Sequence, residues 1–319
     1  MGAVGYACGK VILLGEHAVV YGVPAIAVGI DRGACARAKP LDQGPSRLLV
    51  RGWEIAVRED QDSHDLARAF RALLGPVRPD LPPLPPHSVE VEADLPPGGG
   101  LGCSAAIGVA IARALDPGAA MEVIQARAMA WERIFHGTPS GVDAAVSARG
   151  GCVCFRPGQP LEPLHLRGGA LHLAIGSTGL ASSTKSMVEA VARLRERRPH
   201  IVDKSFEAVR ALVSNARLAI EAGDRIALGR LMDLNQMLLG GLFVSTPEIE
   251  HMCALARDAS AFGAKLTGAG GGGSVVALVG SHAAAERVLA TWKAGGFDGF
   301  ATCVAQEGRA RTLESETAP

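Results

Sequence analysis

A glycine-dense loop followed by a run of small apolar residues constrains the fold of this 319-residue chain more than any other feature. Residues 96–106 read Pro-Pro-Gly-Gly-Gly-Leu-Gly-Cys-Ser-Ala-Ala, and residues 105–115 are small or apolar except for Arg113. The second run predicts a buried helix, so the loop lies at a helix N-terminus. Free backbone N–H groups and the helix dipole make such a loop an anion site, most naturally for phosphate. A plain turn before a core helix is the alternative, but a turn needs only one or two glycines.

The loop departs from the commonest nucleotide-binding motifs. No lysine follows Gly102, as a Walker A loop requires. Gly100, Gly102 and Ala105 match the Gly-x-Gly-x-x-Ala dinucleotide fingerprint, but two prolines separate them from the strand expected at residues 89–93. A nicotinamide-dependent dehydrogenase therefore stays a minor alternative.

The composition predicts about two domains with real cores, since 48% of the residues are hydrophobic. The formal net charge of zero argues against a nucleic-acid or anionic-membrane partner. No apolar run reaches the roughly 18 residues of a membrane span. Lys10, Glu16 and His17 interrupt the apolar N-terminal segment, which excludes a signal peptide. The seven scattered cysteines predict reduced thiols and a cytoplasmic location.

Apolar patterns along the chain predict strands and helices in both halves. Strands are expected at residues 6–14, 24–30, 46–57, 89–93, 152–155, 171–176, 275–279 and 300–304. Helices are expected at residues 105–115, 121–135, 184–196, 205–222, 226–239, 247–261 and 282–293, and Thr138–Pro139 is expected to begin another. The strand at 152–155 closes the first half, so we expect domains at residues 1–168 and 169–319.

Three separated stretches resemble the three motifs of the GHMP small-molecule kinases. They are residues 9–22, the loop at 96–106 and a second glycine loop at 265–274. The first contains Gly-Glu-His-Ala-Val-Val-Tyr-Gly, and residues 136–143 read His-Gly-Thr-Pro-Ser-Gly-Val-Asp, with Glu132 upstream. These two segments are similar to the mevalonate kinases within that family. The resemblance covers nearly the whole chain, with its motifs in the right order.

The resemblance implies an α+β, two-domain GHMP kinase fold. Its N-terminal domain would resemble the second domain of ribosomal protein S5, and its C-terminal domain would be ferredoxin-like. The implied activity is ATP-dependent, magnesium-dependent phosphorylation of (R)-mevalonate on its 5-hydroxyl, within the mevalonate route to isoprenoids. Mevalonate and ATP are then the expected partners, and a homodimer is compatible with the family. The alternatives are another GHMP kinase, such as phosphomevalonate kinase, and a non-catalytic ligand sensor on the same fold.

The resemblance also assigns the nucleotide and metal sites. Without it, Ser104 equally fits a helix N-cap, and Glu132 fits a solvated helical glutamate. In the family, the serine and the glutamate at these positions bind Mg²⁺, which needs few protein oxygens beside phosphate and water. The expected nucleotide-binding residues are Pro97, Gly98, Gly99, Gly100, Leu101, Gly102, Cys103, Ser104, Ala105, Gly268, Gly270 and Gly271.

The catalytic assignment rests on Asp143 and Lys10. Taken alone, Asp143 fits a carboxylate that complements a helix dipole, and Lys10 fits a lysine whose stem lies along apolar surface. In the family, the matching aspartate is the proposed base for the mevalonate hydroxyl, and the lysine is its neighbour. The ammonium favours the ionised carboxylate and can also contact the γ-phosphate. The expected substrate-binding residues are Lys10, Glu16, His17, Ser140, Asp143, Thr184 and Gly270.

Three residues depart from the family pattern. Cys8 stands where relatives usually have proline, and Cys103 stands where they usually have serine, which predicts a thiol-sensitive loop. Ser182 stands where many relatives have arginine. This last departure leaves open how the carboxylate of mevalonate is neutralised, with Lys185 and Ser182 as the candidates.

Overall fold

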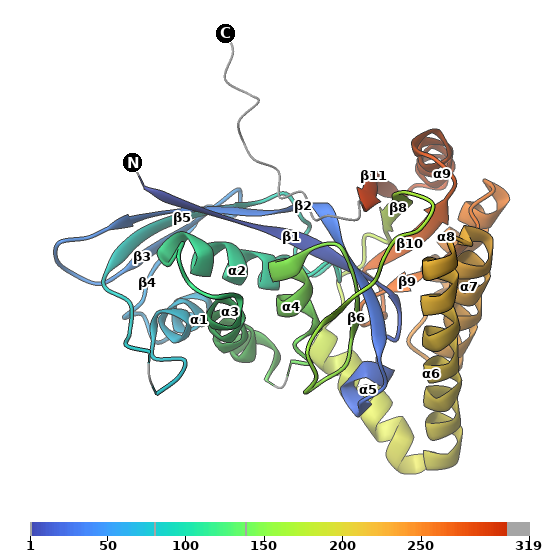
Figure 1. Ribbon diagram of the computed structural model, residues 1–319, viewed down its shortest axis with the longest axis horizontal. Helices are drawn as coiled ribbons and strands as arrows, with labels where there is room; N and C mark the ends of the chain where they lie inside the picture. Colours follow the sequence, from blue (N-terminus) through green and yellow to red (C-terminus); the bar gives the residue numbers. More distant parts are fainter. Residues whose placement is uncertain (1, 80, 138, 305–319) are drawn as a thin grey trace, which may run out of the picture.

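The computed structural model describes residues 2–79, 81–137 and 139–304. Its two halves lie side by side along the long axis of the molecule, each with its own sheet (Figure 1). In the part of the chain that the structure describes, no helix combines the length and apolar character needed to cross a membrane.

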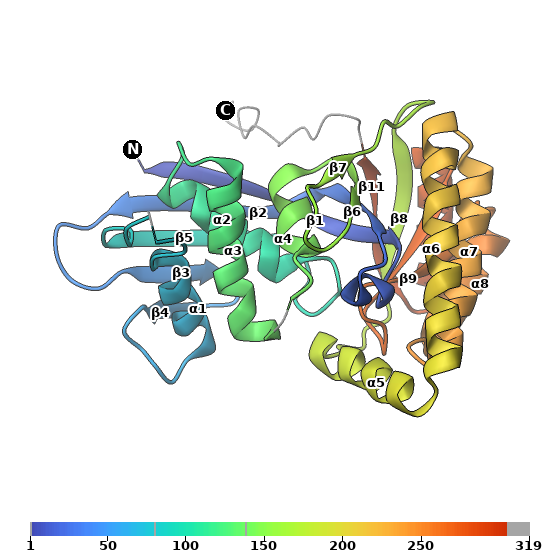
Figure 2. The same cartoon turned by 60° about the horizontal axis from the view of Figure 1, so that its bottom comes forward.

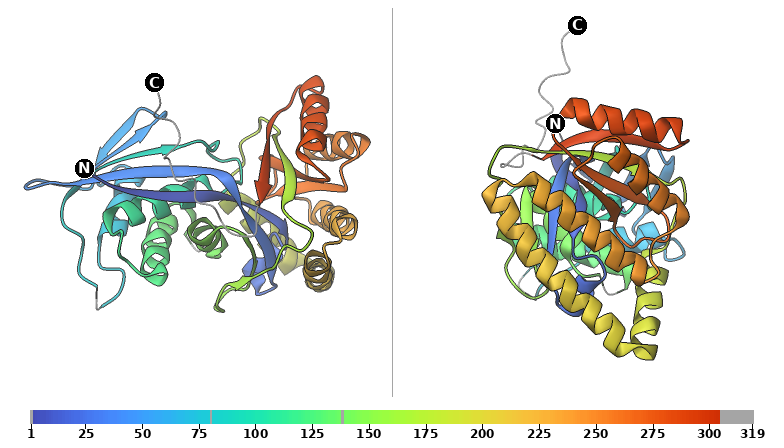
Figure 3. Two further views of the ribbon diagram at one scale, coloured as in Figure 1. Left: turned by 45° about the horizontal axis from the view of Figure 1, so that its top comes forward. Right: turned by 90° about the vertical axis from the view of Figure 1, so that its right-hand side faces the viewer.

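The first half is a mixed sheet with helices on one face (Figures 1 and 3). Its strand order is β4-β3-β5-β2-β6-β7, and β1 pairs with β2 along nearly its whole length. The strands are β1 Ala3–Leu14, β2 Ala25–Pro40, β3 Arg47–Arg51, β4 Ile55–Arg58, β5 His87–Ala93, β6 Cys152–Phe155 and β7 Glu162–Pro163. The helices are the short 3-10 helix Ala18–Tyr21, α1 Asp65–Leu74, α2 Cys103–Leu115, α3 Met121–His136 and α4 Val142–Arg149.

The second half is a four-stranded antiparallel sheet in the order β11-β8-β10-β9. Numbered along the chain within this half, that order is 4-1-3-2, the arrangement of a ferredoxin-like domain. The strands are β8 Leu171–Ser177, β9 Gly263–Thr267, β10 Ser274–Val279 and β11 Asp298–Val304. The helices are α5 Thr184–Arg197, α6 Pro199–Ala222, α7 Arg225–Gly241, α8 Pro247–Asp258 and α9 His282–Ala294. Helices α7, α8 and α9 contact the sheet, whereas α5 reaches back toward the first half (Figure 2).

The helix expected after the first glycine loop is confirmed as the buried centre of the first half. Every residue of α2 is buried except Ser104 and Arg113. The small side chains let α2 lie close to β1: a Cβ built on Gly5 would meet the Ala110 carbonyl oxygen at 2.2 Å. A second close approach joins α2 to α3, where a Cβ on Gly108 would lie 2.9 Å from the Trp131 ring. This packing fixes the helix N-terminus beside the loop.

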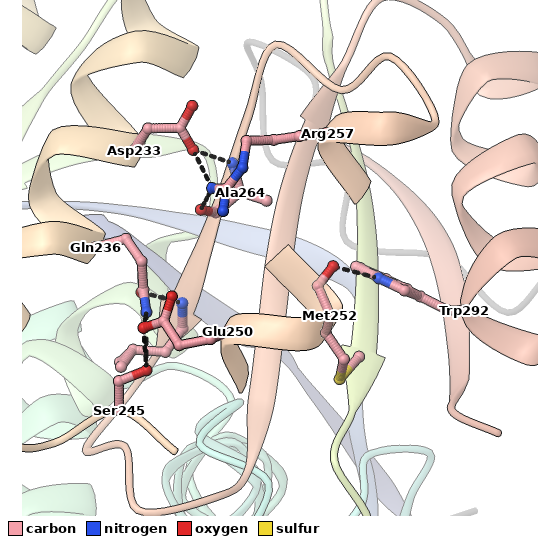
Figure 4. A network of polar contacts seen from close by, with 9 residues as sticks. Asp233, Gln236, Ser245, Glu250, Met252, Arg257, Ala264 and Trp292 are labelled. Carbon is pink, nitrogen blue, oxygen red and sulfur yellow. Dashed lines mark hydrogen bonds and ion pairs between the residues drawn. The ribbon is translucent and has the colours of Figure 1, made fainter. Parts of the chain in front are cut away.

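A polar network holds β9 against α7 and α8 (Figure 4). The Gln236 side chain accepts from Leu266 N at 2.9 Å and donates to Glu250 Oε1 at 2.8 Å. Asp233 Oδ1 accepts from Ala264 N at 3.0 Å and from Arg257 at 2.9 Å. These bonds fix the strand that leads into the second glycine loop.

Several expected elements differ from the observed ones. Helix α1 and strand β9 were not predicted. Helix α6 begins at Pro199, six residues before the expected start, because proline is well tolerated at the first helical position. The helix expected to begin at Thr138–Pro139 begins at Val142, because Gly141 has φ +86° and serves as its N-cap. Thr138 itself lies outside the described residues.

The domain boundary after residue 168 stays a prediction. It falls between β7, which ends at Pro163 in the first sheet, and β8, which begins at Leu171 in the second.

The contact between α7 and β9 generates a stability prediction. A Cβ on Gly229 would lie 2.3 Å from the backbone of Phe262, and one on Gly263 would lie 1.9 Å from the Gly229 carbonyl oxygen. Gly229→Ala should therefore lower the free energy of unfolding by about 1–3 kcal/mol, because two backbones must separate. Gly241→Ala, in open space at the end of the same helix, should be nearly neutral. Urea unfolding of both variants checks this, and equal stabilities would contradict the described packing.

Candidate active site

A cavity of about 350 Å³ lies between the two halves. The first half contributes β1 and the turn after it, the C-terminal part of α3, and the segment leading into α4. The second half contributes the start of α5 and the glycine loop after β9. Motifs that are far apart in the sequence therefore meet around one space.

Lys10 and Asp143 form an ion pair in this cavity. Lys10 Nζ lies 3.1 Å from Asp143 Oδ1 and donates to the Gly100 carbonyl oxygen at 3.0 Å. Strand β1 buries the Lys10 side chain, which is 3% exposed, whereas the Asp143 side chain in the first turn of α4 is 36% exposed. The ammonium is thus held in place by the first glycine loop, and the carboxylate remains accessible from the cavity.

Ser104 and Glu132 form a second polar pair. Ser104 Oγ donates to Glu132 Oε1 at 2.5 Å and accepts from Trp131 Nε1 at 3.1 Å. Helix α2 begins at Cys103 with Gly102 as its N-cap, so Ser104 is not the N-cap. Burial raises the pKa of Glu132 to about 7, with a smaller contribution from the charge of Asp143.

The chemistry of this second pair fits Mg²⁺. A hydroxyl and a carboxylate are hard oxygen donors, and Mg²⁺ normally takes one or two protein oxygens together with phosphate and water. Among the described residues, no group of three or more His, Cys, Asp or Glu side chains could hold a metal by itself. A site for a metal shared with nucleotide phosphates is consistent with both observations.

Glu16 is engaged inside the protein. Its carboxylate forms an ion pair with Lys265 and accepts from Asn235 Nδ2 at 3.2 Å. The side chains of Glu16 and Lys265 are 1% and 0% exposed. Burial raises the pKa of Glu16 and lowers that of Lys265, while each partner opposes these shifts. The Glu16 carboxylate therefore already has two partners inside the protein, and its expected contact with substrate stays a prediction.

His17 connects the first motif to the second glycine loop. Its backbone is left-handed, with φ +59°, and its Nε2 lies 2.8 Å from the Ala269 carbonyl oxygen. Burial lowers the pKa of His17, which favours the neutral ring. Nε2 then carries the proton donated to Ala269, and Nδ1 has a free lone pair.

The two glycine loops face each other. Ser274 Oγ donates to the Gly99 carbonyl oxygen at 2.7 Å. A Cβ on Gly100 would lie 2.8 Å from the Thr267 carbonyl oxygen, and one on Gly268 would lie 3.0 Å from Gly100 Cα. Glycine is therefore required where the loops touch.

The expected site residues fall into two groups. Those that line the cavity are Lys10, Glu16, His17, Gly100, Glu132, Ser140, Asp143, Thr184 and Gly268. Those outside the cavity lining are Pro97, Gly98, Gly99, Leu101, Gly102, Cys103, Ser104, Ala105, Gly270 and Gly271. Members of the second group near Gly100 belong to the loop at the α2 N-terminus, and their nucleotide contacts stay predictions.

Gly270 and Gly271 make internal contacts. The Gly270 carbonyl oxygen accepts from Ser182 Oγ at 2.6 Å, and Gly271 N donates to the Val244 carbonyl oxygen at 2.7 Å. Gly271 N therefore already has an acceptor within the chain.

The thiol sensitivity expected of Cys103 stays a prediction, and the structure argues against it. The side chain is buried, and burial raises the pKa of its thiol to about 12. Because the thiolate is the reactive form of cysteine, this shift disfavours reaction of Cys103 near neutral pH.

Sequence reasoning missed three residues that complete the site. They are Lys265 and Asn235, which hold Glu16, and Thr267, whose Oγ1 accepts from Ile12 N at 3.0 Å. Lys265 carries the only signal visible in the sequence, since it is a lone charge among the apolar residues before the second glycine loop.

Comparisons with known proteins show the family to which the chain belongs. Residues 65–151 match the GHMP kinases N terminal domain, and residues 216–298 match the GHMP kinases C terminal family. The chain is 35% identical to the mevalonate kinase of Pyrococcus abyssi over 84% of its length and 86% of the relative's. It is 34% identical to that of Aeropyrum pernix over 94% and 95% of the two chains.

A solved structure shares the whole architecture. The crystal structure of L. major mevalonate kinase in complex with R-mevalonate is 28% identical, covers 96% of each chain and has a TM-score of 0.79. The expected two-domain fold class is thereby confirmed. With its motifs gathered around one cavity and these similarities along almost its full length, the chain belongs to the mevalonate kinases of the GHMP kinase family.

Proposed function

We propose that this chain transfers the γ-phosphoryl group of ATP to the 5-hydroxyl of (R)-mevalonate, giving 5-phosphomevalonate and ADP. The observation that carries the proposal is the Lys10–Asp143 pair, in which a buried ammonium and an accessible carboxylate meet in a cavity bordered by both glycine loops. The curated relatives named above support mevalonate as the acceptor. We also propose a cytoplasmic location and a homodimer.

Asp143 orients the acceptor hydroxyl. Its exposed carboxylate accepts the hydrogen bond of the 5-hydroxyl and receives its proton as the new bond to phosphorus forms. Lys10 lies beside this carboxylate and also beside Gly100, so its ammonium can stabilise the charge of the transferring phosphoryl group. Positioning and charge stabilisation are the main contributions a protein makes to phosphoryl transfer.

The first glycine loop and the N-terminus of α2 bind the ATP phosphates. Gly98, Gly100 and Gly102 have φ between +71° and +75°, a backbone shape that turns successive N–H groups outward. Ser104 and Glu132 hold Mg²⁺, which when bound neutralises phosphate charge. The loop at Gly268 closes the cavity from the other half.

The substrate lies between the turn after β1 and α5. His17 offers Nδ1 as an acceptor for a mevalonate hydroxyl, while Ser140 and Thr184 offer hydroxyl groups from opposite walls. Glu16 acts through the backbone of its neighbour His17, because Lys265 and Asn235 already occupy its carboxylate.

Acceptor selectivity tests the proposal. A coupled assay of ADP formation with mevalonate, phosphomevalonate, homoserine and galactose should show turnover with mevalonate far above the other three. Preferential turnover of phosphomevalonate would favour the other GHMP kinase, and ligand binding without turnover would favour a sensor.

Replacing the proposed base gives a direct prediction. Asp143→Asn should lower kcat by at least about 100-fold, because a positioned acid–base group is lost. ATP binding, measured by calorimetry, should change little, because Asp143 does not belong to the phosphate loop. Turnover close to that of the wild type would contradict the assignment.

Glu132 links stability to metal binding. The pKa of Glu132 is about 7 in the folded protein, against a usual value of 4.5. The free energy of unfolding is therefore lowered as the pH rises from about 4.5 to 7, and the full loss is present above pH 7. Without metal, Glu132→Gln should therefore raise the free energy of unfolding by about 1–3 kcal/mol at pH 8. The same variant should lose at least about tenfold in magnesium-dependent turnover.

Chemical denaturation at two pH values checks this prediction. The stabilisation should be present at pH 8 and largely absent at pH 5, where the wild-type carboxyl is mostly protonated in the folded protein. If Glu132→Gln is less stable than the wild type at pH 8, the buried, ionised carboxylate does not destabilise the folded protein, and the prediction is contradicted.

A further inference from the structure

Among the described residues that line the cavity, one cationic side chain has no partner. Four basic residues line it: Lys10, His17, His136 and Lys185. Lys10 is paired with Asp143, His17 Nε2 lies 2.8 Å from the Ala269 carbonyl oxygen, and His136 Nε2 lies 3.6 Å from Glu132 Oε2. Among the described residues, Lys185 has neither a hydrogen bond nor an ion pair, so its charge is available to a ligand.

The surroundings of Lys185 favour an anion. It is the second residue of α5, and the first turn of this helix contains no acidic side chain. Unbonded N–H groups at this helix end add positive potential to the ammonium. Glu189, one turn later, also lines the cavity, but Arg193 lies 3.9 Å from its carboxylate and offsets its charge.

Ser182, the other candidate for this role, is already engaged. Its Oγ donates to the Gly270 carbonyl oxygen at 2.6 Å, which fixes the hydroxyl on the second glycine loop. The single O–H donor of Ser182 is therefore used inside the protein, whereas the ammonium of Lys185 keeps all three of its N–H donors.

Resting on the proposed function, we infer that Lys185 is the specificity-determining residue that binds the carboxylate of mevalonate. The 5-hydroxyl and the carboxylate are at opposite ends of a five-carbon chain. With the hydroxyl at Asp143 in the first half, the carboxylate extends to the cavity wall that α5 contributes from the second half. Figure 2 shows α5 reaching toward the first half. Ile12 and Val188 supply apolar lining for the carbon chain between these ends.

A neutral analogue separates this role from a structural one. The kinetics of three variants are measured with two substrates, mevalonate and its primary amide. The variants are Lys185→Met, Lys185→Arg and the control Lys204→Met, which changes an exposed lysine of α6. In Lys185→Met, KM for mevalonate should rise by about 10–100-fold, the usual worth of a charge-assisted hydrogen bond. KM for ATP and kcat should stay nearly constant, and the preference for the acid over the amide should disappear. Lys185→Arg should restore much of that preference.

The outcomes distinguish this inference from the proposed function. A Lys185→Met enzyme that keeps the wild-type preference for acid over amide, as Lys204→Met should, would overturn the assignment of Lys185 while leaving mevalonate phosphorylation intact. Absence of wild-type turnover with mevalonate would overturn the proposed function, and this inference with it.

Discussion

The buried ion pair between Glu16 and Lys265 is the interaction on which the site depends. It joins the turn after β1 in the first half to β9 in the second, and both side chains are almost completely buried. A buried charge that loses its partner typically costs about 3–5 kcal/mol. The pair therefore favours this relative placement of the two halves, because a placement that separated the two groups but kept either of them buried would leave that charge unpaired.

The catalytic geometry follows from this placement. Glu16 precedes His17, whose ring meets Ala269 in the second glycine loop, and Thr267 accepts a hydrogen bond from Ile12 in β1. These contacts hold the loop at Gly268 close to Gly100. The carbonyl oxygen of Gly100 in turn accepts a hydrogen bond from Lys10 Nζ. One network thus runs from the interface to the Lys10–Asp143 pair. In the proposed mechanism, the first half binds phosphate and activates the hydroxyl, and the second half closes the acceptor pocket.

Local sequence patterns predicted the elements whose residues are close together in the sequence. The glycine loop, the buried helix after it and most strands have clear local signals, whereas the resemblance to the GHMP kinases pointed to Lys10 and Asp143. Helix α1 was missed although Leu66, Phe70 and Leu73 lie on one face, and β9 was missed because glycine and lysine interrupt a short strand. The Glu16–Lys265 pair joins residues 249 positions apart, and no local pattern contains that information. The same holds for the contact between Ser182 and Gly270, which lie 88 positions apart in the sequence.

A double-mutant cycle on Glu16→Gln and Lys265→Met tests most directly whether this pair holds the site together. Unfolding free energy and KM for mevalonate are measured for the wild type, both single variants and the double variant. Each single variant should be destabilised by about 3–5 kcal/mol, and the double variant by clearly less than the sum, because it leaves no charge unpaired. KM should rise in all three, because His17 loses its fixed position. Strictly additive losses of stability, or an unchanged KM in the single variants, would contradict the account.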